Sequence, residues 1–246
     1  MERKIRVGAV SYLNTKPLLY GIRRSALLQQ IELTENYPSL IAQQLIDGTI
    51  DVGLVPVVVI PKLKEHFIIS DYCIGAVNEV ASVCLFSDVP LEQIEKILLD
   101  YQSRTSVALI KILLKNYWKM HPILEDAKEN FRLSIRGTTA GMIIGDSAFE
   151  QRLQSKYIYD LSLAWKAYSG LPFVFAAWVA NKQLPDHFIE AFNDANAIGL
   201  RHLDDVTATL ESPYYDLKKY YTQNISYNLD EEKRRGMQRF LKELES

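Results

Sequence analysis

The amino-acid sequence predicts an α/β protein containing a parallel sheet, and three features of the chain support this class. Short apolar runs rich in β-branched residues alternate with segments of helical period. Residues 5–55 hold three such runs with two helical segments between them, and right-handed crossovers make strands in that order parallel. With 246 residues, 48% of them hydrophobic, the chain is long enough to bury a large core and to form two lobes.

In the first part of the chain, apolar runs mark the strands and turn-forming residues mark the helix ends. Strands are expected at residues 5–10, 31–34 and 50–55. A first helix is expected to start at Thr15, a candidate N-cap, with Pro17 in its first turn. Pro38 begins the second helix, and Gly48 supplies its C-terminal stop.

The same alternation continues through the rest of the chain. Strands are expected at residues 80–87, 96–100, 141–145 and 173–180. A long helix is predicted from about Arg104 to Tyr117, because apolar residues recur there at helical spacing and Ser103 is a natural N-cap. After Pro185 the chain is predicted to be mainly helical.

Charge and cysteine content exclude several classes of protein. The 28 Lys and Arg residues face 30 Asp and Glu, so the basic excess of a nucleic-acid-binding protein is missing. Cys73 and Cys84 form no motif, which is typical of a reducing compartment. The N-terminal residues resemble no signal peptide, and the longest apolar run, residues 52–60, is too short to span a bilayer. We therefore expect a cytoplasmic protein with neither nucleic-acid nor membrane partners.

The motifs of familiar enzyme chemistry are missing from the sequence. It has no Gly-x-Gly-x-x-Gly, no Walker lysine loop, no His-Glu-x-x-His and no Gly-x-Ser-x-Gly elbow. The four histidines are scattered beside charged or turn-forming residues and are expected at the surface. We therefore expect neither a metal site nor a bound cofactor.

Polar clusters follow three of the expected strands. They are residues 11–15, residues 103–106, and the pair Gly145 and Asp146. Because ligands of open α/β sheets bind beyond the carboxyl ends of the strands, these clusters are candidates for a ligand site.

Two of these clusters allow a structural and a functional interpretation. Ser103, Arg104 and Thr105 open a helix, where they could bind a carboxylate or phosphate, or form a cap beside a surface arginine. Asn14 could be a turn residue, or its amide could hold a substrate hydroxyl or carboxylate. The residue pattern alone leaves both pairs of alternatives open.

The run VGAVSYLNTKPL at residues 7–18 resembles the signature of the chorismate dehydratases of the futalosine route to menaquinone. The likeness continues, in the family's order, at IDVGLVP (50–56), SVCLFS (82–87), SRTSVAL (103–109), IGDSA (144–148), Trp165, GLPFVFA (170–176) and Trp178. The sequence ISYNL (225–229) is also similar. Lys16 stands where many members have arginine, and Ser169 where threonine is usual, and both keep the chemical type.

This resemblance implies a two-lobed fold like the type II periplasmic binding proteins, each lobe a mainly parallel sheet flanked by helices. The chain is expected to cross between the lobes near residues 86–89 and again near 174–180. Lobe I would then comprise residues 1–86 plus 179–246, and lobe II residues 87–178, with the ligand cleft between them.

The resemblance also implies the function of a hydro-lyase that converts chorismate to 3-((1-carboxyvinyl)oxy)benzoate by losing water across C3–C4, with no cofactor. In this family the enolpyruvyl carboxylate of the substrate is thought to take the C3 proton, and Asn14 would orient it as the catalytic residue. The expected substrate-binding residues are Ser11, Thr15, Ser82, Ser103, Arg104, Thr105, Gly145, Asp146 and Ser169.

Two other functions are compatible with the same fold. One is a non-enzymatic binding protein for a small anion, against which the lack of a signal peptide and the polar SYLN turn both count. The other is the related naphthoate-forming enzyme of the same pathway, whose substrate is a cyclic futalosine derivative. The SYLNT run favours the dehydratase over that enzyme.

Overall fold

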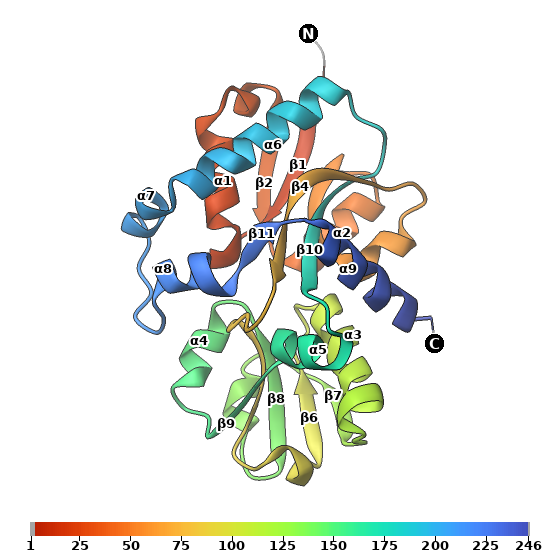
Figure 1. Cartoon of the computed structure of the whole chain (residues 1–246), viewed down its shortest axis with the longest axis vertical. Coiled ribbons are helices and arrows are strands. Elements are labelled where there is room, and N and C mark those ends of the chain that lie inside the picture. Colours follow the sequence, from red (N-terminus) through yellow and green to blue (C-terminus); the bar gives the residue numbers. More distant parts are fainter. Residues whose placement is uncertain (1–2, 246) are drawn as a thin grey trace.

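The computed structural model describes residues 3–245 and contains two β-sheets, one above the other in Figure 1, with helices around both. The first sheet has the strand order β11-β4-β10-β3-β1-β2. Its strands are β1 (Ile5–Val10), β2 (Ile31–Asn36), β3 (Val52–Pro56), β4 (Phe67–Ala76), β10 (Phe173–Ala180) and β11 (Ser226–Asn228).

The second sheet has the strand order β7-β6-β8-β5-β9. Its strands are β5 (Val83–Ser87), β6 (Lys96–Leu99), β7 (Ile123–Asp126), β8 (Thr139–Ile144) and β9 (Tyr157–Asp160). The helices are α1 (Lys16–Arg24), α2 (Pro38–Ile46), α3 (Arg104–Ile112), α4 (Ser147–Arg152), α5 (Leu161–Ser169), α6 (Asp186–Arg201), α7 (Leu203–Ala208), α8 (Leu217–Lys219) and α9 (Glu231–Glu243).

The expected α/β class is confirmed, but each sheet is mixed rather than mainly parallel. β1 pairs in parallel with both β2 and β3, as right-handed crossovers predict. β10 pairs antiparallel with β3 and β4, and β5 pairs antiparallel with β8 and β9. The reason is the route of the chain: β10 enters the first sheet from the second, so it starts at the edge where β1 and β3 end.

The strand pairing shows that the chain passes between the two sheets at other residues than expected. The chain leaves the first sheet after β4 and enters the second at Val83, so residues 83–86 pair in the second sheet. It returns after α5, and residues 173–178 already pair in the first sheet. We propose that the lobes divide at these two passages, instead of at residues 86–87 and 178–179.

Helix α1 is held against α6 by an unusually close crossing, seen at the left of Figure 1. A Cβ atom on Gly199 of α6 would overlap the carbonyl oxygen of Pro17, and one on Gly21 of α1 would overlap that of Ala195. Glycine at both positions therefore lets the helices touch backbone to backbone. This contact fixes the start of α1, the helix that follows the polar cluster at residues 11–15.

A network of charged side chains stabilises the starts of β1 and β3, the strand ends opposite to the polar cluster at residues 11–15. The buried Asp51 carboxylate accepts hydrogen bonds from Arg6 Nε at 3.1 Å, Arg6 Nη2 at 2.9 Å and Lys182 Nζ at 2.9 Å. Burial alone would raise the pKa of Asp51, but these hydrogen bonds outweigh it and hold the pKa well below its ordinary value.

The helix expected to end at Tyr117 continues to Trp118 but changes its winding. Regular α-helix ends at Ile112, and a π-helical turn covers Leu113–Trp118.

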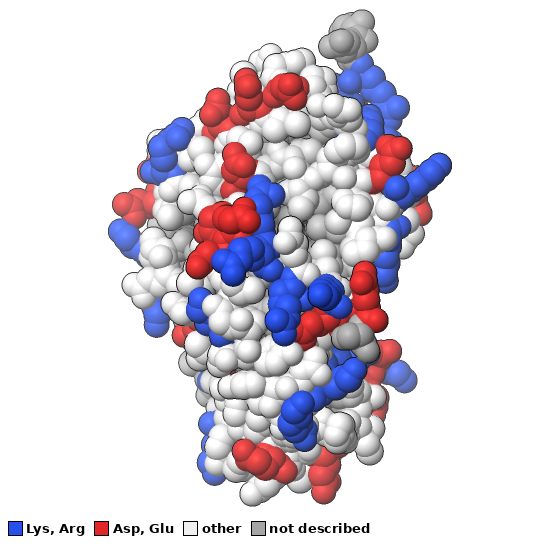
Figure 2. Space-filling model, turned by 45° about the vertical axis from the view of Figure 1, so that its right-hand side comes forward, with Lys and Arg blue, Asp and Glu red and all other residues white. Residues whose placement is uncertain are grey.

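Within residues 3–245, no helix is both long and apolar enough to cross a membrane. Figure 2 shows acidic and basic side chains interspersed over one face of the molecule.

Candidate active site

A cavity lies between the two sheets, beyond the ends of β1, β3 and β8. The 18 residues that line it come from both sheets: Val10, Tyr12, Asn14, Thr15, Pro38, Leu54, Pro56, Ile74, Val80, Ser82, Val83, Ser103, Thr105, Ser106, Ile144, Gly145, Phe175 and Ala176. None of these 18 residues is Asp, Glu, His, Lys or Arg.

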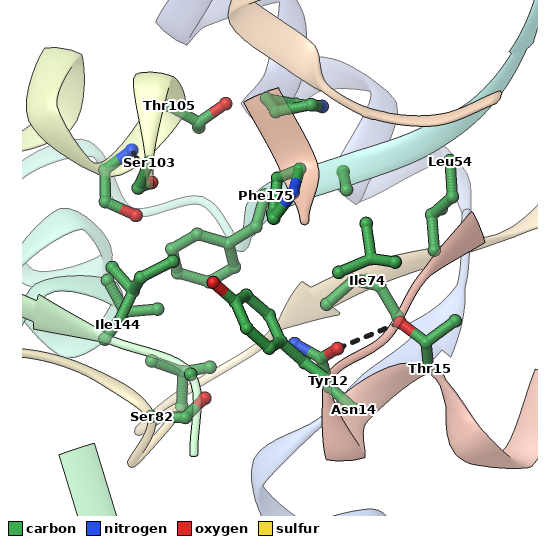
Figure 3. Close-up of a pocket in the computed structure, with 18 residues that line it drawn as sticks. Tyr12, Asn14, Thr15, Leu54, Ile74, Ser82, Ser103, Thr105, Ile144 and Phe175 are labelled. Carbon is green, nitrogen blue, oxygen red and sulfur yellow. Dashed lines mark hydrogen bonds between the residues drawn. The ribbon is translucent and has the colours of Figure 1, made fainter. Parts of the chain in front are cut away.

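The turn between β1 and α1 brings Asn14 to the cavity. The Thr15 hydroxyl donates to Asn14 Oδ1 at 3.1 Å, the contact drawn as a dashed line in Figure 3. Thr15 occupies the N-cap position of α1 as expected, but its side chain makes no capping hydrogen bond. Its hydroxyl instead orients the amide of Asn14.

Two buried tyrosines hold the backbone of this turn from behind. Tyr221 donates its hydroxyl to the Leu13 carbonyl at 3.0 Å, and Tyr227 donates to the Asn14 carbonyl at 2.8 Å. Neither tyrosine lines the cavity, and sequence reasoning did not assign either to the site. The similarity at residues 225–229 was the one signal that included Tyr227.

The start of α3 forms the opposite side of the cavity, where Figure 3 places Ser103 and Thr105 across from Asn14 and Ser82. Ser103 caps the helix, because its hydroxyl accepts the Ser106 N–H at 3.1 Å. The structural interpretation of this cluster is confirmed at Ser103, which is a cap and also lines the cavity. A helix start carries a partial positive charge, which favours an anion nearby.

Arg104 does not line the cavity, contrary to the sequence-based expectation. An α-helix turns by roughly 100° per residue, so Thr105 and Ser106 project at roughly 100° and 200° from Arg104. Both of those side chains line the cavity, and this places the half-buried Arg104 on a different side of the helix.

Ser82 is held at the cavity wall by a strained turn. Ala81 has φ +63°, and the Ser82 N–H donates to the Val80 carbonyl at 2.8 Å, closing a γ-turn. The buried Asp160 carboxylate accepts the N–H groups of Val80 at 3.0 Å and Ala81 at 2.8 Å. Gly145 N–H donates to the Ser82 carbonyl at 2.8 Å, so the backbone of Ser82 is fixed on both sides.

Two carboxylates lie beside the cavity, in a neighbouring hollow that shares Tyr12 and Ile144 with it. They are Asp100 and Asp146, and burial raises the pKa of both. Asp146 accepts the backbone N–H of Leu13 at 3.1 Å. Tyr12 donates its hydroxyl to Gln102, so both contacts tie the turn after β1 to the second sheet.

The structure brings six of the ten expected site residues together in the lining: Asn14, Thr15, Ser82, Ser103, Thr105 and Gly145. The other four lie outside it. Ser11 is exposed and extends the β1–β2 ladder through its N–H, Arg104 projects from another side of α3, and Asp146 is the acceptor for Leu13. Ser169 closes the end of α5 by donating to the Trp165 carbonyl at 2.8 Å and accepting from the Leu171 N–H at 3.1 Å.

The apolar walls of the cavity were not predicted as site residues. Leu54, Ile74, Ile144 and Phe175 lie in strands, where an apolar residue is indistinguishable by sequence from ordinary core. Together with the hydroxyl and amide groups, they give the cavity an apolar wall with a few polar groups, the composition usual for small-molecule sites. Within residues 3–245, no group of three or more His, Cys, Asp or Glu side chains could hold a metal ion.

Two mixed sheets joined by two passages, with a cavity between them that residues of both line, define a two-lobed α/β protein of the periplasmic-binding-protein fold. The periplasmic aliphatic sulphonate binding protein of Escherichia coli has a similar structure, with a TM-score of 0.62 and 14% sequence identity. The match covers 100% of this chain and 87% of that protein.

Within this fold, the chain belongs to the menaquinone biosynthesis family, whose model matches residues 5–246. A chorismate dehydratase of Thermus thermophilus is 26% identical over 261 residues, covering 97% of this chain and 94% of the relative. A chorismate dehydratase of Campylobacter jejuni is 26% identical over 244 residues, covering 96% of this chain and 95% of the relative.

Proposed function

We propose that this protein is a chorismate dehydratase, a hydro-lyase that converts chorismate to 3-((1-carboxyvinyl)oxy)benzoate and water. The observation that carries the proposal is the cavity, in which an apolar wall is combined with uncharged hydroxyl and amide groups at two helix starts. Membership of the menaquinone biosynthesis family and two relatives named chorismate dehydratase support the same activity.

The cavity suits a ring that carries two carboxylates. Leu54, Ile74 and Phe175 would contact the apolar ring, while the starts of α1 and α3 would receive the carboxylates. A wall free of Asp and Glu side chains avoids charge repulsion with a dianion.

The proposed reaction needs no base from the protein. The enolpyruvyl carboxylate of the substrate takes the proton from C3, and the electrons of that C–H bond form the new C3–C4 double bond. The C4–O bond breaks, the departing hydroxide takes up the proton from the enolpyruvyl carboxyl group and leaves as water, and the ring becomes aromatic. Asn14 would hold the enolpyruvyl carboxylate close to C3, which is a proximity and orientation effect, and its amide does not compete for the proton.

The test is to incubate the purified protein with chorismate and identify the products by liquid chromatography and mass spectrometry. The proposal predicts loss of one water and an aromatic product that keeps the enolpyruvyl group. A parallel reaction with the cyclic futalosine derivative tests the naphthoate-forming alternative. Chorismate that is bound in equilibrium dialysis but recovered unchanged would instead identify a binding protein.

A further inference from the structure

Tyr220 lies behind the cavity wall, between two of the polar residues that line it. Its side chain is fully buried and is not part of the lining. The Tyr220 hydroxyl is 2.7 Å from Ser82 Oγ, and the Asn14 side chain lies near it. Tyr220 therefore contacts the polar wall at Ser82 without lining the cavity.

Either hydroxyl can be the donor in the contact between Tyr220 and Ser82. Each hydroxyl carries a single proton, so when Tyr220 donates to Ser82 Oγ, the proton of Ser82 is free to point into the cavity that Ser82 lines. Burial raises the pKa of Tyr220 far above its ordinary value, so the phenol keeps this proton at neutral pH.

The backbone of Ser82 is fixed independently of Tyr220. The γ-turn at Ala81, the Asp160 carboxylate and the Gly145 N–H hold the main chain of residues 80–82. What remains to be set at Ser82 is the direction of its hydroxyl proton, and the Tyr220 hydroxyl, 2.7 Å away, is close enough to set it.

We propose that Tyr220 is a positioning residue for the dehydration: its hydroxyl orients the Ser82 hydroxyl so that Ser82 donates a hydrogen bond to an oxygen of the substrate. This inference rests on the proposed chorismate dehydratase function and extends it to a residue that does not touch the substrate.

The experiment compares the steady-state kinetics of Tyr220→Phe with those of the parent protein on chorismate. The ring and its packing on Phe149 remain, and only the hydroxyl is lost. Because Tyr220 makes no ligand contact, KM should stay within about twofold, while kcat should fall about tenfold, the effect of one misdirected hydrogen bond. Tyr215→Phe is the matched control, since its hydroxyl donates to Asn224 and it lies outside the lining; it should keep the parent kcat.

A double-variant cycle tests whether Tyr220 acts through Ser82. Ser82→Ala should lose at least as much kcat as Tyr220→Phe, and the double variant should be no slower than Ser82→Ala alone. Additive losses would overturn the inference, as would a Tyr220→Phe variant with the parent kcat. If Tyr220→Phe fails to fold, a Ser82→Ala variant as active as the parent still overturns it. A parent protein that leaves chorismate unchanged would refute the proposed function itself, whereas the other outcomes refute only the role of Tyr220.

Discussion

The backbone N–H of Leu13 donates to the Asp146 carboxylate at 3.1 Å, joining the turn after β1 to the end of β8 in the other sheet. The contact is formed beside the cavity, because Asn14 and Gly145, the neighbours of these two residues, both line it. Together with the contact from Tyr12 to Gln102, this hydrogen bond links the arrangement of the two lobes to the position of Asn14.

We predict that Asp146→Ala loosens this link. The N–H of Leu13 would lose its acceptor, so the free protein should be more open and KM for chorismate should rise about tenfold, the effect of one charge-assisted hydrogen bond. Asp146→Asn keeps an acceptor oxygen and is the control, expected to stay close to the parent. Small-angle scattering of the ligand-free variants measures the opening. If Asp146→Ala had the parent's scattering curve and KM, the link would have no functional weight.

The crossing of α1 and α6 predicts a large effect of one methyl group. In Gly199→Ala the new Cβ would overlap the Pro17 carbonyl, so α1 must shift, which should cost about 1–3 kcal/mol of stability. The shift would displace Asn14 as well, so kcat should fall. Asp194→Ala, at an exposed position of α6, should change stability by less than about 0.5 kcal/mol. Thermal melting compares them, and equal melting temperatures for Gly199→Ala and the parent would refute the close crossing.

The network around Asp51 predicts how stability depends on pH. The folded-state pKa of Asp51 lies below the unfolded value of about 4, so its contribution is present above about pH 4 and is lost as pH falls through the folded pKa. At neutral pH, Asp51→Asn should lower stability by about 1.5 kcal/mol, since Arg6 and Lys182 remain partly open to solvent. The difference in stability between Asp51→Asn and the parent should become smaller below about pH 4. Asp47→Asn, at an exposed site, is the control, and a gap that stays constant down to about pH 2 would contradict this assignment.

The elements with a strong local signal were predictable from the sequence. The strand Ile5–Val10 is an apolar run, and the starts of α1 and α2 are marked by Pro17 and Pro38. The strands that sequence reasoning missed lack such signals. Ile123–Asp126 is an exposed edge strand, Ser226–Asn228 has only three residues, and Phe67–Ala76 contains Asp71 and Tyr72 among its apolar residues.

The candidate site was predictable where local chemistry decides it. Asn14, Ser103 and Thr105 follow strands and open helices, and this pattern brings them to the cavity. At Arg104 the sequence does not show which side of the helix lines the cavity. Once Thr105 and Ser106 are known to line it, helical geometry places the Arg104 side chain outside the cavity. Tyr220 could not be found this way, because its 138-residue separation from Ser82 is bridged only by the tertiary fold.

The most direct test of this account compares the turnover of chorismate by the parent, Asn14→Ala and Asn14→Asp. If the substrate supplies the base, Asn14→Ala loses the orienting amide and should be slow. Asn14→Asp has nearly the same shape but places a negative charge beside a dianionic substrate, so its kcat/KM should be lower still. This order, parent above Asn14→Ala above Asn14→Asp, is the predicted result. A rate for Asn14→Asp equal to or above that of the parent would place a working base at this position and contradict substrate-assisted dehydration.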